Sequence, residues 1–161
     1  MRKFTALPFL LLVASAFAAT HKVPNDEPIA TVEIPDKWQT AQRGEAIEAS
    51  SPDGALHFLV TPVEQKKIAE AMGEAMRYIR NTGGIVVRPD TRKNEAGTIN
   101  GIDVQHVTWQ GKAKSGDVKM RFTVFSLTKD KPLLAVYWGS PAAEKKYEAD
   151  LKKMLESIRQ A

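Results

Sequence analysis

The chain has 161 residues, a formal net charge of +4 and no cysteine. The lack of cysteine excludes disulfides, a cysteine nucleophile, a cysteine-ligated iron–sulfur cluster and thiolate zinc sites. The Lys and Arg residues are scattered along the chain rather than concentrated in one segment, so nucleic-acid binding is not expected. A weak attraction to anionic lipid or glycan stays open, and a solvated surface of mixed charge is the simpler interpretation.

The first residues have the features of a secretory signal peptide. Arg2 and Lys3 precede an apolar stretch from Leu7 to Phe17, and Ala16-Phe17-Ala18 provides a small-x-small cleavage pattern. This stretch is shorter than the ~20 residues of a membrane-spanning helix, and polar residues follow it. We therefore expect residues 1–19 to be removed on export. The product would be a soluble periplasmic or secreted protein with no membrane-spanning segment, beginning at Ala19 or Thr20.

The predicted mature chain divides into a short leader and one domain. Residues 20–28 are polar and contain Pro24 and Pro28, so we expect a mobile leader. Residues 29–161 show no internal repeat and no second linker, which favours a single domain. A domain of about 130 residues is long enough to bury a core without disulfides.

The first part of the domain predicts a strand and then a hairpin. Ala30, Val32 and Ile34 alternate with polar residues, which is typical of a half-buried strand. Ser51-Pro52-Asp53-Gly54 has the pattern of a type I turn between strands 45–50 and 55–60. This register places Ile47 and Ala49 on one face with three apolar residues of the second strand, Leu56, Phe58 and Val60. Glu48 is then expected near His57 on the opposite face.

A helix is predicted after this hairpin. Thr61-Pro62-Val63-Glu64 resembles a capping box with proline at the first helical position. Apolar residues recur at intervals of three and four from Ile68 to Ile79, and Gly83-Gly84 can end the helix in a left-handed conformation. The stripe contains Met72 and Met76. We expect it to be a core face, with a Met-rich partner groove as the alternative.

The second half of the domain predicts an antiparallel sheet and a last helix. Residues 85–87 form a strand, 88–94 are polar, and strands 102–113 and 118–128 flank a turn at 114–117. Strand 133–138 then pairs back. The predicted first face contains Val107, Trp109, Met120, Phe122, Val124, Ala135 and Tyr137. The predicted second face contains Val104, His106, Phe125, Leu127, Leu134, Val136 and Trp138.

Because both faces are apolar, both must be covered. Ser140 can cap, and Pro141 can open, a helix whose apolar stripe runs from Tyr147 to Ile158. The fold class is therefore α+β, an antiparallel sheet flanked by helices. One helix could cover each face, or both could share one face with a layer of loops on the other.

The order of these elements resembles the PsbP-like superfamily, and in particular DcrB-like bacterial envelope proteins. The residues that carry the resemblance are Val32 to Trp38, Ser51 to Gly54, the helix from Glu64, Gly101, and Tyr147 to Ile158. The resemblance covers nearly all of residues 29–161 and implies an α/β/α sandwich. It also implies an accessory or assembly role, and no functional residue can be carried over from it.

Residue types that could carry catalysis do not form a recognised constellation. His21, His57 and His106 are far apart in the predicted elements, whereas a zinc site needs ligands that converge. Ser126 lies near His106 without a nucleophile elbow. Acidic residues of the last helix alternate with lysines, as on a solvated face. We therefore predict no catalytic residue, no metal site and no cofactor.

The leading hypothesis is a non-enzymatic periplasmic accessory or binding protein whose partner is an envelope protein. The candidate partner-binding residues are Trp38, Arg88 and Arg92, although a lid over the core is the favoured role of Trp38 and a binding anchor is the alternative. An envelope hydrolase with an unrecognised site is the second hypothesis. An inhibitor or immunity protein for an envelope enzyme is the third, and it would insert a polar loop formed by Arg88 to Gly97.

Overall fold

The computed structural model describes residues 18–161, and these residues form two sheets and three α-helices. The predicted signal peptide, residues 1–19, lies outside the described residues except for its last two positions. The small sheet has the order β1-β2-β10, with β1 at Ala18–Val23, β2 at Ala30–Pro35 and β10 at Arg159–Gln160. No helix among residues 18–161 has the length and apolar character needed to cross a membrane.

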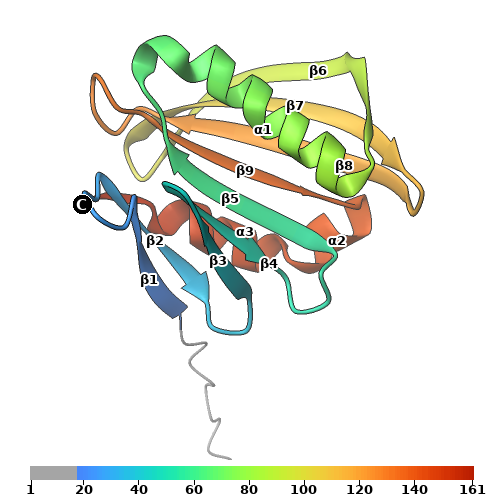
Figure 1. Cartoon of the computed structure of the whole chain (residues 1–161), viewed down its shortest axis with the longest axis horizontal. Coiled ribbons are helices and arrows are strands. Elements are labelled where there is room, and N and C mark those ends of the chain that lie inside the picture. The colour runs from blue at the N-terminus through green and yellow to red at the C-terminus, as the bar shows by residue number, and fades with distance from the viewer. Residues whose placement is uncertain (1–17) are drawn as a thin grey trace, which may run out of the picture.

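The large sheet has seven antiparallel strands in the order β3-β4-β5-β9-β8-β7-β6 (Figure 1). Its first half consists of β3 (Gln39–Arg43), β4 (Ala46–Ser50) and β5 (Leu56–Pro62). Its second half consists of β6 (Val86–Ile99), β7 (Ile102–Ala113), β8 (Gly116–Phe125) and β9 (Leu133–Gly139). Between the halves lie the 3-10 helix η1 (Gln65–Lys67) and α1 (Ile68–Gly83). The chain continues after β9 into α2 (Pro141–Lys146) and α3 (Glu148–Ser157).

The large sheet is covered on both faces, as its apolar composition predicts. Helix α1 crosses one face, and α2 and α3 lie on the other side (Figure 1). Phe122 is fully buried in the cluster under α1, and Phe125 is fully buried in the cluster that α2, α3 and β2 close. Helices therefore cover both faces, and the alternative with a layer of loops on one face does not apply.

The residues expected to be a mobile leader include a paired strand, so that prediction is wrong for β1. Strand β1 pairs antiparallel with β2, from Ala18 opposite Pro35 to Val23 opposite Ala30. Val23 is fully buried, and its carbonyl oxygen accepts a bond of 3.0 Å from the Ile29 amide. Backbone pairing and the burial of one valine order a segment whose side chains are mostly polar.

The predicted capping box is part of a strand, so helix α1 begins later than expected. Thr61 and Pro62 pair with β9, and the Val63 amide continues that pairing with a 2.9 Å bond to the Pro132 carbonyl. The β-ladder satisfies backbone groups that a helix start would leave unpaired. The predicted end is confirmed: Gly84 has a φ of 58° and its amide bonds back to the Arg80 carbonyl.

The first hairpin has the predicted faces, and Glu48 lies near His57 on the face opposite Ile47, although the two are not directly paired. Glu48 lies opposite Leu59, and His57 lies opposite Ser50. His57 Nδ1 is 3.0 Å from Ser50 Oγ, and its ring stacks on Trp138 at 5.1 Å. Glu48 accepts bonds from Arg43 of the unpredicted strand β3 and from Tyr78 Oη, the latter at 2.9 Å.

Strand β9 is shifted by one residue from the predicted register. Val136 lies opposite Phe122 and Trp138 opposite Met120, so both share the face under α1. Tyr137 lies opposite Arg121 on the other face. Every residue of β9 is buried, so its sequence has no polar alternation that could show which residues point to which face.

The polar stretch expected to be a loop is the edge strand β6. It pairs with β7 from Val86 to Arg88 and again from Lys93 to Ile99, with a register shift between the two stretches. The inhibitor hypothesis required a projecting loop from Arg88 to Gly97, and the observed strand removes that feature. The last helical segment begins as predicted: Ser140 Oγ accepts a 3.1 Å bond from the Ala143 amide, and α2 begins at Pro141. The single helix predicted there is divided at Tyr147 into α2 and α3.

Candidate functional site

An open groove lies over β6, β7 and β8, on the face of the large sheet opposite α1. Most side chains of β6 are exposed, whereas those of β9 are all buried. The hollow has a volume of about 510 Å³. We call it the β6–β8 groove, and it is lined by Arg88, Thr91, Lys93, Glu95, Thr108, Gln110, Asp117, Val118, Lys119, Arg121 and Pro141.

Strand register brings the polar residues of the groove together. Arg88 lies opposite Gln110, which lies opposite Lys119. Lys93, Thr108 and Arg121 form the next such row across the three strands. Because alternate residues of a strand point to opposite faces, these rows share one face while their neighbours join the core under α1. The sequence signal was present in β8, where Asp117, Lys119 and Arg121 alternate with buried apolar residues. Lys93 was missed because its stretch was interpreted as a loop.

The charges of the groove are mostly loosely paired. Arg88 lies 3.9 Å from Asp117, and Arg121 lies 3.9 Å from Glu95. Lys119 has a closer partner in Glu144 of α2, at 2.7 Å. Lys93 has no ion pair within residues 18–161. Four basic and two acidic side chains line the groove, so its surface favours an acidic partner.

A second hollow of about 400 Å³ adjoins the groove at Arg121 and contains the ionisable groups closest to an enzyme-like arrangement. His106 Nδ1 is 2.9 Å from Thr123 Oγ1, and burial lowers the pKa of His106, which keeps the ring neutral at pH 7. Burial and the nearby Glu144 raise the pKa of Tyr137 to about 12. A phenol with a raised pKa stays protonated and is a poor general base.

The three candidate partner-binding residues lie in three different places. Trp38 is 4% exposed, its Nε1 donates to Asp150 Oδ2 at 3.0 Å, and its ring meets Tyr147 edge-on at 5.6 Å. It is therefore a lid over the core, the favoured of the two roles considered, and not an exposed anchor. Arg88 lines the β6–β8 groove. Arg92 lies on the opposite side of β6, 5.4 Å over the ring of Trp109.

Arg92 and Trp109 border a small hollow next to helix α1. Its volume is about 290 Å³, and Met72 and Met76 also line it. The helix stripe otherwise packs on the sheet, as expected for a core face. The methionines are only partly buried, so this hollow is a secondary candidate for partner contact.

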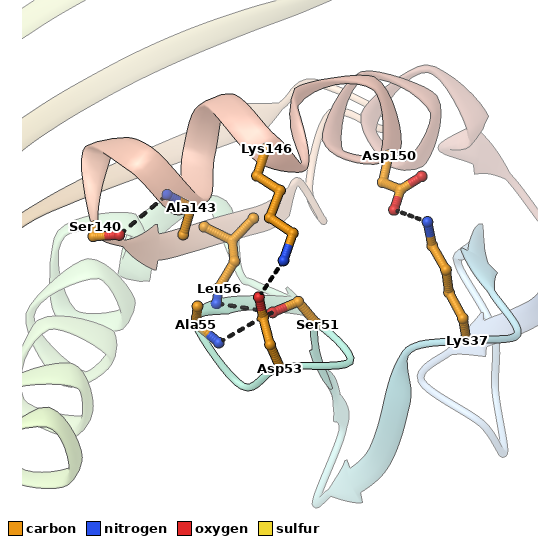
Figure 2. Close-up of polar contacts among 9 residues, drawn as sticks. All are labelled: Lys37, Ser51, Asp53, Ala55, Leu56, Ser140, Ala143, Lys146 and Asp150. Carbon is orange, nitrogen blue, oxygen red and sulfur yellow. Dashed lines mark hydrogen bonds and ion pairs between the residues drawn. The ribbon is translucent and has the colours of Figure 1, made fainter.

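Three of the segments linked to the resemblance, around Lys37, Asp53 and Asp150, lie close together and are joined by ion pairs. Figure 2 shows Lys146 of α2 reaching Asp53 in the first hairpin, at 2.7 Å, and Lys37 reaching Asp150 of α3, at 2.9 Å. Asp53 Oδ1 also accepts bonds from Ser51 Oγ at 2.8 Å and from the Ala55 amide at 3.1 Å. These residues tie the hairpin turn to the last helices, and their role is structural.

The histidines are in separate surroundings. His21 pairs opposite Val32 in the small sheet, while His57 and His106 lie in different clusters of the large sheet. Within the described residues 18–161, no group of three or more His, Asp or Glu side chains is arranged to hold a metal ion.

Comparison with known proteins gives similarity in structure only. No family model matches the chain, and no curated protein matches it. The cyanobacterial PsbP protein CyanoP of Synechocystis superposes with a TM-score of 0.57 and 10% identity, covering 96% of this chain and 99% of CyanoP. LpqN, involved in cell envelope biogenesis of Mycobacterium tuberculosis, superposes with a TM-score of 0.50 and 12% identity, covering 88% of this chain and 90% of LpqN.

A structure from Bacteroides thetaiotaomicron gives a TM-score of 0.56 with 9% identity over 82% of this chain. The match covers 45% of the Bacteroides chain, so the present chain spans less than half of that protein. The architecture defines an α+β sandwich around an antiparallel sheet. The chain has the PsbP-like fold, and the fold resemblance seen in the sequence is confirmed.

Proposed function

We propose that the protein is a non-enzymatic accessory protein of the bacterial envelope that binds a protein partner through the β6–β8 groove. The observation that carries the proposal is the open, charged groove over β6, β7 and β8, on the face of the sheet opposite α1. Small-molecule sites are usually concave, mostly apolar and enclosed. This groove is polar and open along a sheet edge, which suits the surface of another protein better.

The envelope location rests on two independent supports. The predicted signal peptide, residues 1–19, directs export, with a periplasmic or secreted product. LpqN shares the fold and is involved in cell envelope biogenesis in its own organism. The DcrB-like resemblance of the sequence motifs agrees with the same compartment.

The proposed partner presents an acidic surface to the groove. Arg88 and Lys93 would supply the contacts, because neither has a close internal ion pair in the described chain. Loose pairs at a groove rim can exchange partners at little cost, since exposed ion pairs contribute only about 0–1 kcal/mol. Arg92, on the other side of β6, would extend the contact around the sheet edge.

Site-specific photo-cross-linking tests this proposal directly. Gln110 lies in the groove, and Gln105 is an equally exposed glutamine of β7 on the opposite face. A photoreactive residue at Gln110 should give a discrete adduct with one envelope protein in intact cells, identified by mass spectrometry. The same residue at Gln105 should not give that adduct.

Two results of this experiment would contradict the proposed groove. If Gln110 and Gln105 give the same pattern, or neither gives a discrete adduct while the protein is exported and folded, the groove is an ordinary solvated surface. Adding Arg88→Glu to the Gln110 variant gives a further check, because the adduct should then weaken.

A further inference from the structure

The two edges of the large sheet are protected to different degrees. At one edge, β6 contains Pro89, which has no amide donor, and a register shift between Arg88 and Lys93. Charged side chains also recur along it. Proline, bulges and charges are the devices that keep an edge strand from pairing with another chain.

At the other edge, β3 has none of these devices except one arginine. Its five residues, Gln39-Thr40-Ala41-Gln42-Arg43, are all exposed, and β4 is the one strand paired with β3 in the described chain. Arg43 already bonds to Glu48 of β4. The outer backbone groups of this regular strand, whose one charged side chain is already paired, are therefore free to pair.

The sequence of this edge is complementary to itself. In an antiparallel pair of two β3 strands with Ala41 on the two-fold axis, Gln39 faces Arg43 and Thr40 faces Gln42. No like charges meet in this register. Lys37 before the strand approaches Glu45 after the partner strand, which adds opposite charges at both ends. A slip that places Arg43 on the axis would bring two arginines together, and such pairs are destabilising.

We propose that β3 is a homodimerisation edge, at which two copies of this chain pair antiparallel and extend the sheet across both. The contact is isologous, as in most two-fold dimers. The strand is short, so the buried area lies below the ~1,200–2,000 Å² of standard stable interfaces and the association depends on concentration. The β6–β8 groove is at the other end of the strand order, so the dimer leaves both copies of the groove open.

The absence of cysteine makes disulfide trapping a clean test. Opposite residues of an antiparallel pair have Cα atoms about 4.5–5.5 Å apart, within the range that a disulfide spans. Ala41→Cys should therefore form a covalent dimer under mild oxidation, several-fold more than Thr98→Cys at the exposed β6 edge. Equal trapping at both edges would show random collision and overturn the proposal.

Sedimentation gives a readout that does not depend on cysteine. The average mass of the unmodified chain should rise toward that of a dimer with increasing concentration. Ala41→Lys places two like charges at the axis and should stay monomeric, whereas Thr98→Lys should behave like the unmodified chain. Circular dichroism checks that each variant is folded. An unmodified chain that stays monomeric at every concentration, or an Ala41→Lys variant that still dimerises, would contradict the proposal.

Discussion

Asp53 shows how one residue of the first hairpin turn connects distant parts of the chain. Its carboxylate bonds to Lys146 of α2, to the Ser51 hydroxyl and to the Ala55 amide. These bonds hold the pKa of Asp53 well below its usual value of 3.8, and the bond from Lys146 contributes most to the shift. A carboxyl group with a lowered pKa stabilises the fold when it is ionised.

The pH dependence of stability follows from this shift. Above pH 3.8 the Asp53 contribution is fully present, and it is lost as the pH falls through the lower folded-state pKa. Asp53→Asn should therefore lower the urea midpoint at pH 7 relative to the unmodified chain, and the difference should narrow below about pH 4. Asp26→Asn, at an exposed aspartate, is the control. A difference that is constant with pH would mean that the charge of Asp53 does not stabilise the fold.

Single residues were harder to predict than the elements that contain them. Glu48 lies near His57 as expected, but the residues that bind its carboxylate, Arg43 and Tyr78, were not predicted. The sequence signal for Arg43 is weak because β3 is exposed on both faces and has no apolar alternation. Arg88 and Arg92 would share a face in a regular strand, and the register shift between Arg88 and Lys93 separates them.

At the scale of elements, hydrophobic alternation predicted the strands that contain it and missed the strands that lack it. The shared face of β7 and β8 was predicted correctly, with Val107, Met120 and Phe122 on one side. The turn was predicted too long, because β8 begins at Gly116 and Ala113 lies opposite that residue. The leader and the capping box were misjudged for another reason, since backbone pairing with β2 and β9 decided both segments. Tertiary pairing of this kind overrides local propensity.

The two-sided cover of the large sheet gives a prediction at this scale. Phe122 and Phe125 are both fully buried, in clusters on opposite faces. Phe122→Ala and Phe125→Ala should each reduce the free energy of unfolding by about 3–5 kcal/mol, measured by urea denaturation. Val86→Ala, at a side chain that is 70% exposed, should change it by no more than about 0.5 kcal/mol. A near-neutral result at one phenylalanine would mean that its face of the sheet is open.

At the scale of the whole molecule, the uneven cover of the sheet is what links fold to function. Helix α1 closes one face, and α2, α3 and β2 close part of the other, which leaves the β6–β8 groove exposed with its charges loosely paired. The fold class could be predicted from the sequence. The groove could not, because its floor combines residues of three strands and its rim depends on a strand interpreted as a loop.

The most direct test of the partner-binding groove is to reverse the charge of Lys93. Lys93 has no ion pair within residues 18–161, so Lys93→Glu removes no internal contact of that kind and should leave the melting temperature unchanged. Lys22→Glu on β1 is the matched control, since Lys22 is exposed and lies outside the groove. The measurement is quantitative mass spectrometry of envelope proteins that co-purify with each variant. The partner cross-linked at Gln110 should be retained with Lys22→Glu and strongly reduced with Lys93→Glu. Equal recovery of that partner with both variants would contradict the groove as its binding surface.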